Sequence, residues 1–226
     1  MGTRGYERAA QVQYRPGEVI LEIGSGESTH WMARHCPDRR IYSVDPKFDQ
    51  RLSGLPVNVR LLTHFAEEAL KDWDEPIGFA WLDGWDYPYT SVDYPQQRAE
   101  YELYGQEFSQ AASMRSHLDI ARNIAGHARV IAFDDTWRTH HFLNGEWRLD
   151  ACLVTCPPAT TPAPALAMDT PFHRDVCGLS ADHPHHTDPD RGWAGKGGTA
   201  IPWLLDHGYT CTHYALGLVV LEKENA

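Results

Sequence analysis

Short apolar runs recur along the first 135 residues, and most of them stop at an acidic residue. The runs are Val19–Ile23, Ile41–Val44, 79–82 and 129–133. The last three stop at Asp45, Asp83 and Asp134. Runs this short, with a helix-compatible segment between the first two, indicate strands of a parallel sheet that alternate with helices. Because such sheets bind ligands at the carboxyl ends of their strands, we expect the acids to meet in one crevice.

The remaining pattern predicts two helices and a hairpin. Residues 103–125 favour a helix that joins the third strand to the fourth, in keeping with right-handed crossovers. A second helix is expected over residues 198–207, followed by β-rich runs at 209–214 and 217–221 that are close enough for a hairpin. We therefore predict an α/β fold with a Rossmann-like, doubly wound, mostly parallel sheet that ends in an antiparallel hairpin.

One stretch, residues 139–191, does not fit this alternation. It is rich in Pro, Thr, Ala and His, a composition that buries little apolar surface. We expect an irregular insertion after the fourth strand that acts as a lid, within one domain over residues 1–226. A zinc site is the alternative for its Cys and His residues, but their spacings match no standard zinc module.

Composition narrows the range of partners. The chain has 20 basic and 31 acidic residues and a net charge of -11, without a basic cluster that could follow a phosphate backbone. It lacks an apolar leader and a stretch long enough to span a bilayer, and its five cysteines are an odd number. We expect a cytoplasmic protein that binds a small molecule rather than nucleic acid or membrane, and we leave homo-oligomerisation open.

The glycine turn after the first run has the chemistry of a nucleoside site. Gly24 and Gly26 permit a tight turn and close approach to a ligand, and the amides of the following helix can receive a carboxylate. Asp45 ends the next strand, where a carboxylate can accept both hydroxyls of an adenosine ribose. A dinucleotide usually calls for a third glycine where this chain has Thr29, which disfavours NAD.

The pattern E-x-G-x-G with V-D downstream resembles the first two motifs of class I methyltransferases, which use S-adenosylmethionine (SAM). The resemblance implies that Gly24 and Gly26 line the methionine part of SAM. It also implies that Glu22 supports the loop and that Asp45 binds the ribose. SAM is accordingly the expected cofactor.

The resemblance covers about residues 18–135 and 195–223. Within it, the segment THFAEEAL implies an adenine contact near His64 or Phe65, and Asp83 should border the cofactor. An ordinary loop that enters a helix is the alternative for His64 and Phe65.

The acids at the later strand ends suggest a metal. An alcohol is a poor methyl acceptor until its proton leaves, and Mg²⁺ held by carboxylates can lower the pKa of a bound hydroxyl. Asp83, Asp134 and Asp135 resemble the acids of metal-dependent O-methyltransferases that modify sugars and other natural products. We predict these three residues as Mg²⁺ ligands. The alternative is that they orient loops and cap a helix.

Three residues are candidates for catalysis. His140 and His141 follow the acidic pair and can act as bases that take the proton of the acceptor. Lys196 stands among glycines before a predicted helix, where it can hold an acidic group or contact the carboxylates. The alternative is that all three are exposed loop residues.

The predicted function is Mg²⁺-assisted transfer of a methyl group from SAM to a hydroxyl of a small molecule. Metal-independent N- or C-methylation stays open as an alternative. So do an NAD-type oxidoreductase, which Thr29 and the lack of an evident Tyr-x-x-x-Lys pair disfavour, and a non-catalytic SAM-binding protein.

Overall fold

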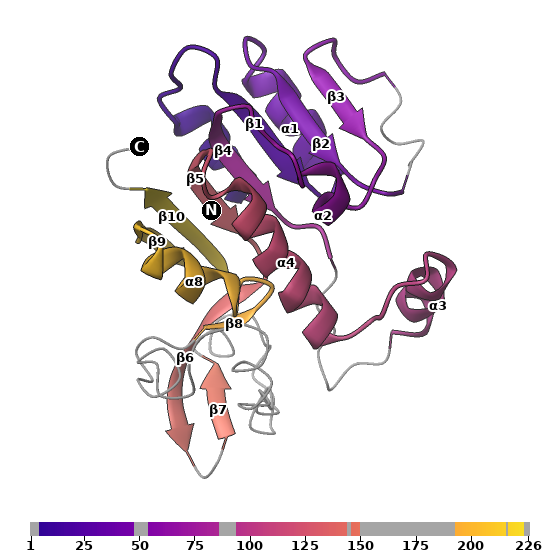
Figure 1. The fold of residues 1–226 in the computed structure, drawn as a ribbon, viewed down its shortest axis with the longest axis vertical. Helices are drawn as coiled ribbons and strands as arrows, with labels where there is room; N and C mark the ends of the chain where they lie inside the picture. Colours follow the sequence, from indigo (N-terminus) through magenta and orange to yellow (C-terminus); the bar gives the residue numbers. More distant parts are fainter. Residues whose placement is uncertain are drawn as a thin grey trace.

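A seven-stranded sheet forms the centre of the computed structural model, which describes residues 5–47, 54–85, 94–143, 146–149, 193–215 and 217–223. The strands are β1 (Val19–Ile23), β2 (Ile41–Val44), β3 (Val59–Leu62), β4 (Ile77–Leu82), β5 (Ala128–Phe133), β9 (Tyr209–Ala215) and β10 (Leu218–Lys223). Their order is β3-β2-β1-β4-β5-β10-β9 (Figure 1). Strands β1 to β5 pair in parallel, whereas β10 pairs antiparallel with β5 and β9. The predicted fold class is confirmed.

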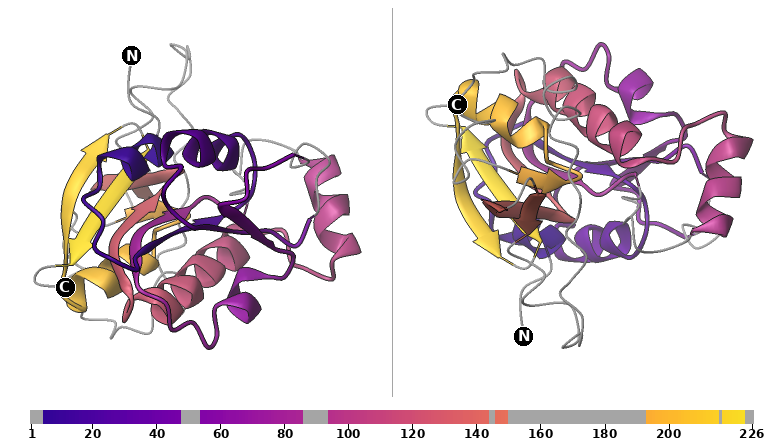
Figure 2. Two further views of the ribbon diagram at one scale, coloured as in Figure 1. Left: turned by 90° about the horizontal axis from the view of Figure 1, so that it is seen from above. Right: turned by 90° about the horizontal axis from the view of Figure 1, so that it is seen from below.

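Helices cover both faces of this sheet (Figure 2). They are η1 (Gly5–Gln11), α1 (Glu27–His35), α2 (Ala66–Ala69), α4 (Gln110–Ile124) and α8 (Ala200–Asp206), whereas α3 (Pro95–Leu103) lies to one side of the sheet. Successive side chains of a strand point to opposite faces. Accordingly, Leu21 packs with Leu118 of α4 and Leu204 of α8, whereas Ile20 packs with Met32 of α1 on the other face.

The predicted helix over residues 103–125 is wrong at its start. The chain instead forms α3 and α4 with a break between them. Gly105 has a φ of 66°, the left-handed conformation that ends helices. Ser109 then caps α4, because its hydroxyl accepts a hydrogen bond from the backbone N–H of Ala112 at 3.0 Å. Two separate local signals therefore divide the segment.

A second, small sheet begins where the irregular insertion was predicted. Strand β6 (Thr136–Leu143) pairs antiparallel with β7 (Glu146–Leu149) and with β8 (Trp193–Gly195). The insertion predicted over residues 139–191 therefore opens with a hairpin, and its irregular start is corrected. The lid prediction for the rest of the insertion falls on residues 150–192, outside the described residues.

Within the described parts of the chain, no helix has both the length and the apolar character needed to cross a membrane.

Candidate functional site

The turn after β1 is packed tightly against the end of β4. Gly24 has a φ of 90°, and a Cβ built on it would lie 2.6 Å from the backbone oxygen of Asp83 and 2.9 Å from Cα of Gly84. Any other residue would therefore be strained and would clash with backbone. The N–H of Gly24 donates to the carbonyl of Val44 at 2.9 Å, so this turn joins the ends of β1, β2 and β4.

The buried carboxyl group of Glu22 binds residues on both sides of this turn. Glu22 has no exposed surface and accepts hydrogen bonds from Ser28, from Thr29 at 2.6 Å and from Ser43 at 2.6 Å. Burial raises the pKa of Glu22 to about 7, and the charge of Asp83 adds to this, although the three hydroxyl donors oppose it. Glu22 thus ties the start of α1 to β1 and β2.

A cavity of about 260 Å³ opens beside the turn. It lies where strand order reverses, because β2 flanks β1 on one side and β4 flanks it on the other. Asp45 lines the cavity, and its Oδ2 and Oδ1 accept hydrogen bonds from the backbone N–H groups of Ser25 (2.9 Å) and Lys47 (2.8 Å). Burial raises the pKa of Asp45, and the two N–H donors oppose that rise.

Aromatic side chains form part of the other cavity walls. Phe65 lines the cavity, whereas His64 and Gly26 are not among the described residues of its wall. Tyr101 of α3 and Tyr104, the residue that follows α3, also line it, and the sequence analysis missed both. The ring of Phe65 meets that of Tyr104 edge to face at 6.3 Å between centroids. Nothing in the local sequence of α3 indicated that this helix would reach the crevice.

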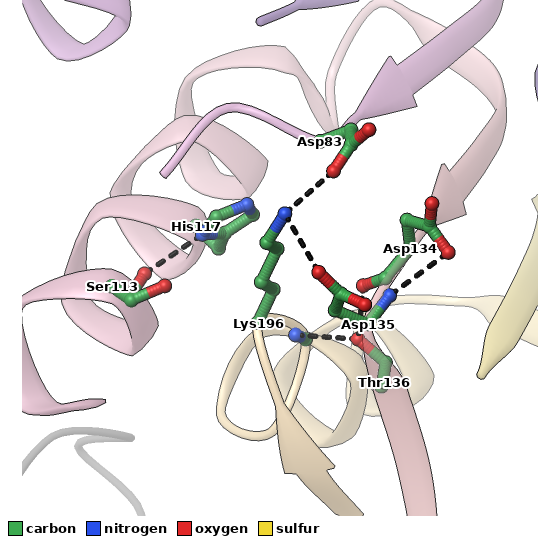
Figure 3. Close-up of polar contacts among 8 residues, drawn as sticks. Asp83, Ser113, His117, Asp134, Asp135, Thr136 and Lys196 are labelled. Atoms are coloured by element: carbon green, nitrogen blue, oxygen red, sulfur yellow. Dashed lines mark hydrogen bonds and ion pairs between the residues drawn. The ribbon is translucent and has the colours of Figure 1, made fainter. Parts of the chain in front are cut away.

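A lysine pairs with two acids that follow β4 and β5, Asp83 and Asp135 (Figure 3). Nζ of Lys196 lies 2.5 Å from Oδ1 of Asp83 and 3.1 Å from Oδ2 of Asp135. Asp135 has a φ of 46°, which is uncommon for a residue with a Cβ, while Oδ1 of Asp134 accepts a hydrogen bond from the N–H of Asp135 at 3.0 Å. The expected contact of Lys196 with the carboxylates is present, and its catalytic role stays a prediction.

Burial and charge act against each other at this lysine. Lys196 is 3% exposed, and burial lowers the pKa of its ammonium, but Asp83 and Asp135 raise that pKa by more. The ammonium therefore stays charged. Burial raises the pKa of Asp134 to about 6, with Asp83 and Asp135 contributing, whereas burial and then the charge of Lys196 lower the pKa of His117 to about 3.

This arrangement does not fit the predicted Mg²⁺ site. The ammonium of Lys196 already lies between Asp83 and Asp135, so a divalent cation on the same oxygens would meet a positive charge at contact distance. Among the described residues, no three His, Cys, Asp or Glu side chains are grouped to hold a metal ion. The structure pairs Asp83 and Asp135 with Lys196 instead, and the role of Asp83, Asp134 and Asp135 as Mg²⁺ ligands stays a prediction.

The two candidate histidines lie in β6. The backbone at His140 and His141 is part of that strand, not of a loop, and their side chains fall outside the described part of the structure. Their catalytic role stays a prediction.

Comparison with solved structures gives several matches, two of which have low sequence identity and TM-scores below 0.5. No family model and no curated protein sequence matches the chain. The pyocyanin biosynthetic protein PhzM is 12% identical with a TM-score of 0.42, over 97% of this chain and 54% of PhzM, so the chain spans about half its length. An rRNA methylase from Streptococcus thermophilus is 16% identical with a TM-score of 0.41, over 99% of this chain and 98% of the methylase. The fold class rests on the strand order itself, a doubly wound sheet with a cavity at its switch point.

Proposed function

We propose that the chain is a SAM-dependent methyltransferase that acts on a hydroxyl group of a small molecule. The observation that carries the proposal is the cavity at the switch point of the sheet, bounded by Gly24 and by the carboxylate of Asp45. Open α/β sheets bind their ligands at this point. The E-x-G-x-G turn and the acid after β2 therefore stand where a nucleoside-type cofactor would be held.

Each part of the cofactor has a candidate partner in the chain. Each carboxylate oxygen of Asp45 accepts one backbone N–H and keeps a further lone pair for a ribose hydroxyl. The amides at the start of α1 suit the carboxylate of the methionine part. Phe65 and Tyr104 offer an aromatic wall for adenine.

The acceptor is proposed to bind on the β4 and β5 side of the cavity. When bound, SAM supplies a methyl group on a positively charged sulfur, and the chain has to align the acceptor with it. Asp83 borders both regions, because its backbone packs on Gly24 and its carboxylate joins the acidic cluster. The negative charge of this cluster suits a neighbouring sulfonium. Mg²⁺ is left out of the proposal, because Lys196 takes the position between the carboxylates.

A proton has to leave the acceptor hydroxyl. Asp134 is one proposed base, since a carboxyl whose pKa is raised to about 6 takes a proton more readily than an ordinary one. His140 and His141, which follow it in β6, are proposed as the other candidates. With this proton removed, the acceptor oxygen would have a lone pair available for the methyl group that bound SAM would supply.

Calorimetry with SAM and with its demethylated product tests the cofactor assignment. We expect both to bind, and Asp45→Ala to weaken both by about tenfold or more, because charge-assisted hydrogen bonds are worth about 1.5 to 3 kcal/mol. The exposed Asp72→Ala is the matched control and should bind as the wild type does. Tight binding of NAD without binding of SAM would overturn the proposal.

A further inference from the structure

Lys196 is aimed at the carboxylates by a fixed loop between β8 and α8. Its backbone N–H donates to the carbonyl of Asp135 at 3.0 Å, and the N–H of Gly197 donates to the hydroxyl of Thr136 at 2.8 Å. A Cβ on Gly197 would lie 2.9 Å from Ile201 and 3.0 Å from Thr136, so the loop passes close to β6 and α8. The backbone therefore sets where the ammonium lies.

The ammonium of Lys196 neutralises carboxylates from two strand ends, as a metal ion bound between such carboxylates would. A buried charge must be paired, and Lys196 is paired with Asp83 and Asp135 from two different strand ends. A divalent cation between strand-end acids would join the same groups. The lysine supplies a positive charge there as a covalent part of the chain.

A neighbouring histidine points to a ligand at the same place. Nδ1 of His117 lies 2.8 Å from the carbonyl of Ser113, which can only accept, so Nδ1 carries the proton and Nε2 has a free lone pair. His117 is fully buried, and its Nε2 has no hydrogen-bond partner among the described residues. Figure 3 shows its ring beside the ammonium of Lys196.

One chemical group satisfies both residues. An ammonium has three N–H donors, and the contacts with Asp83 and Asp135 use two of them. A hydroxyl oxygen can accept the third, and the hydrogen of the same hydroxyl can be donated to Nε2 of His117. A carboxylate could accept from Lys196 but has no hydrogen for His117.

We propose that Lys196 is the resident cation of the acceptor site in place of a divalent metal, and that it binds a hydroxyl together with His117. The identification of that hydroxyl as the methyl acceptor rests on the proposed function. The position of Lys196 among the carboxylates does not.

Manganese binding, followed by electron paramagnetic resonance in the absence of SAM, tests the first part. The wild type should bind no stoichiometric Mn²⁺, because the ammonium occupies the carboxylates. Lys196→Met leaves Asp83, Asp134 and Asp135 without their cation and should bind Mn²⁺ at least tenfold more tightly. Adding Asp135→Asn to that variant should remove most of the gain. Stoichiometric Mn²⁺ in the wild type that Asp83→Asn weakens would overturn the proposal, and so would no gain in Lys196→Met.

A measurement on the wild-type protein tests the same proposal if Lys196→Met does not fold. With ¹³Cε-labelled lysine, the resonance of Lys196, assigned by its loss in Lys196→Arg, should not move when Mg²⁺ is added. Displacement of the lysine by Mg²⁺ would shift it and refute the proposal. Calorimetry with SAM on the same samples keeps the two hypotheses apart, since a protein that fails to bind SAM still gives a metal result.

Phenol and anisole test the hydroxyl part, because they share a ring and differ in the O–H donor. In ¹⁵N-histidine spectra, phenol should shift the Nε2 resonance of His117, whereas anisole should leave it in place. The shift should be lost in Lys196→Met, or in Lys196→Arg if the former is unfolded. An unchanged Nε2 resonance at saturating phenol, or equal shifts with both probes, would overturn this assignment.

Discussion

The two sides of the crevice hold their carboxylates in different ways. On the β1 and β2 side, Glu22 is held by hydroxyl groups and Asp45 by backbone N–H groups, all from one strand, turn, helix and strand unit. On the β4 and β5 side, Asp83 and Asp135 are held by the ammonium of Lys196, and Asp83 is 113 residues away from it in the chain. The first side should therefore tolerate changes in the second, and mutations should separate cofactor binding from acceptor chemistry.

The largest effect is expected at Lys196. Lys196→Met leaves Asp83 and Asp135 without their cation, so turnover should fall by at least 100-fold once an acceptor is known. The free energy of unfolding should fall by about 2 to 3 kcal/mol. Removing one partner of a fully buried ion pair costs about 3 to 5 kcal/mol, and the loss is smaller here because the two carboxylates are partly exposed. Chemical denaturation and turnover measure these losses.

If the two sides of the crevice are independent, the affinity of Lys196→Met for SAM should stay within about twofold of that of the wild type. The exposed Lys71→Met is the matched control for loss of one positive charge and should change neither stability nor turnover. A large loss of SAM affinity in Lys196→Met would mean that the two sides are not independent.

The next effect is on the pH dependence of stability. Burial raises the pKa of Glu22 from 4.5 to about 7, so the folded protein binds this proton more tightly than the unfolded chain. The resulting stabilisation is complete below pH 4.5 and is lost as the pH rises to about 7, by a few kcal/mol, because one pKa unit corresponds to about 1.4 kcal/mol. Glu22→Gln stays neutral and should flatten the curve.

Urea denaturation at several pH values between 4.5 and 8 measures this change. The exposed Glu68→Gln should keep the slope of the wild type. A residual slope is expected in Glu22→Gln from Asp134, whose pKa is raised to about 6 in the same direction. An unchanged slope in Glu22→Gln would show that Glu22 does not titrate in this range.

Local sequence was enough to predict the central strands and the glycine turn after β1. The apolar runs marked β1, β2, β4 and β5, because these strands are almost entirely buried. Strand β3 was missed because it is short and only partly buried, with Arg60 exposed. The hairpin after β5 had a signal that was overlooked: Asn144 and Gly145 form a dipeptide that favours tight hairpin turns.

The acceptor side depends on contacts between distant parts of the chain. Spacing along the sequence did not indicate whether Lys196 or a metal ion would be the partner of Asp83. The position of Lys196 depends on how the turn after β8 packs against the end of β5. The cavity wall at α3 has the same cause, since Tyr101 and Tyr104 line it together with Gly24 and Asp45, which are distant in the sequence.

The smallest effect is expected on SAM affinity and concerns Phe65 and His64, two neighbours that the sequence left as equal candidates for the adenine contact. Phe65 lines the cavity and meets the ring of Tyr104, whereas His64 is exposed. Phe65→Ala should weaken SAM binding by about fivefold, since loss of an aromatic contact costs on the order of 1 kcal/mol beyond the area it buries. His64→Ala is the matched control and should change affinity by less than about twofold in the same calorimetric titration. If His64→Ala had the larger effect, the adenine of the cofactor would have to lie outside this cavity, and the division of the crevice into a cofactor side and an acceptor side would have to be redrawn.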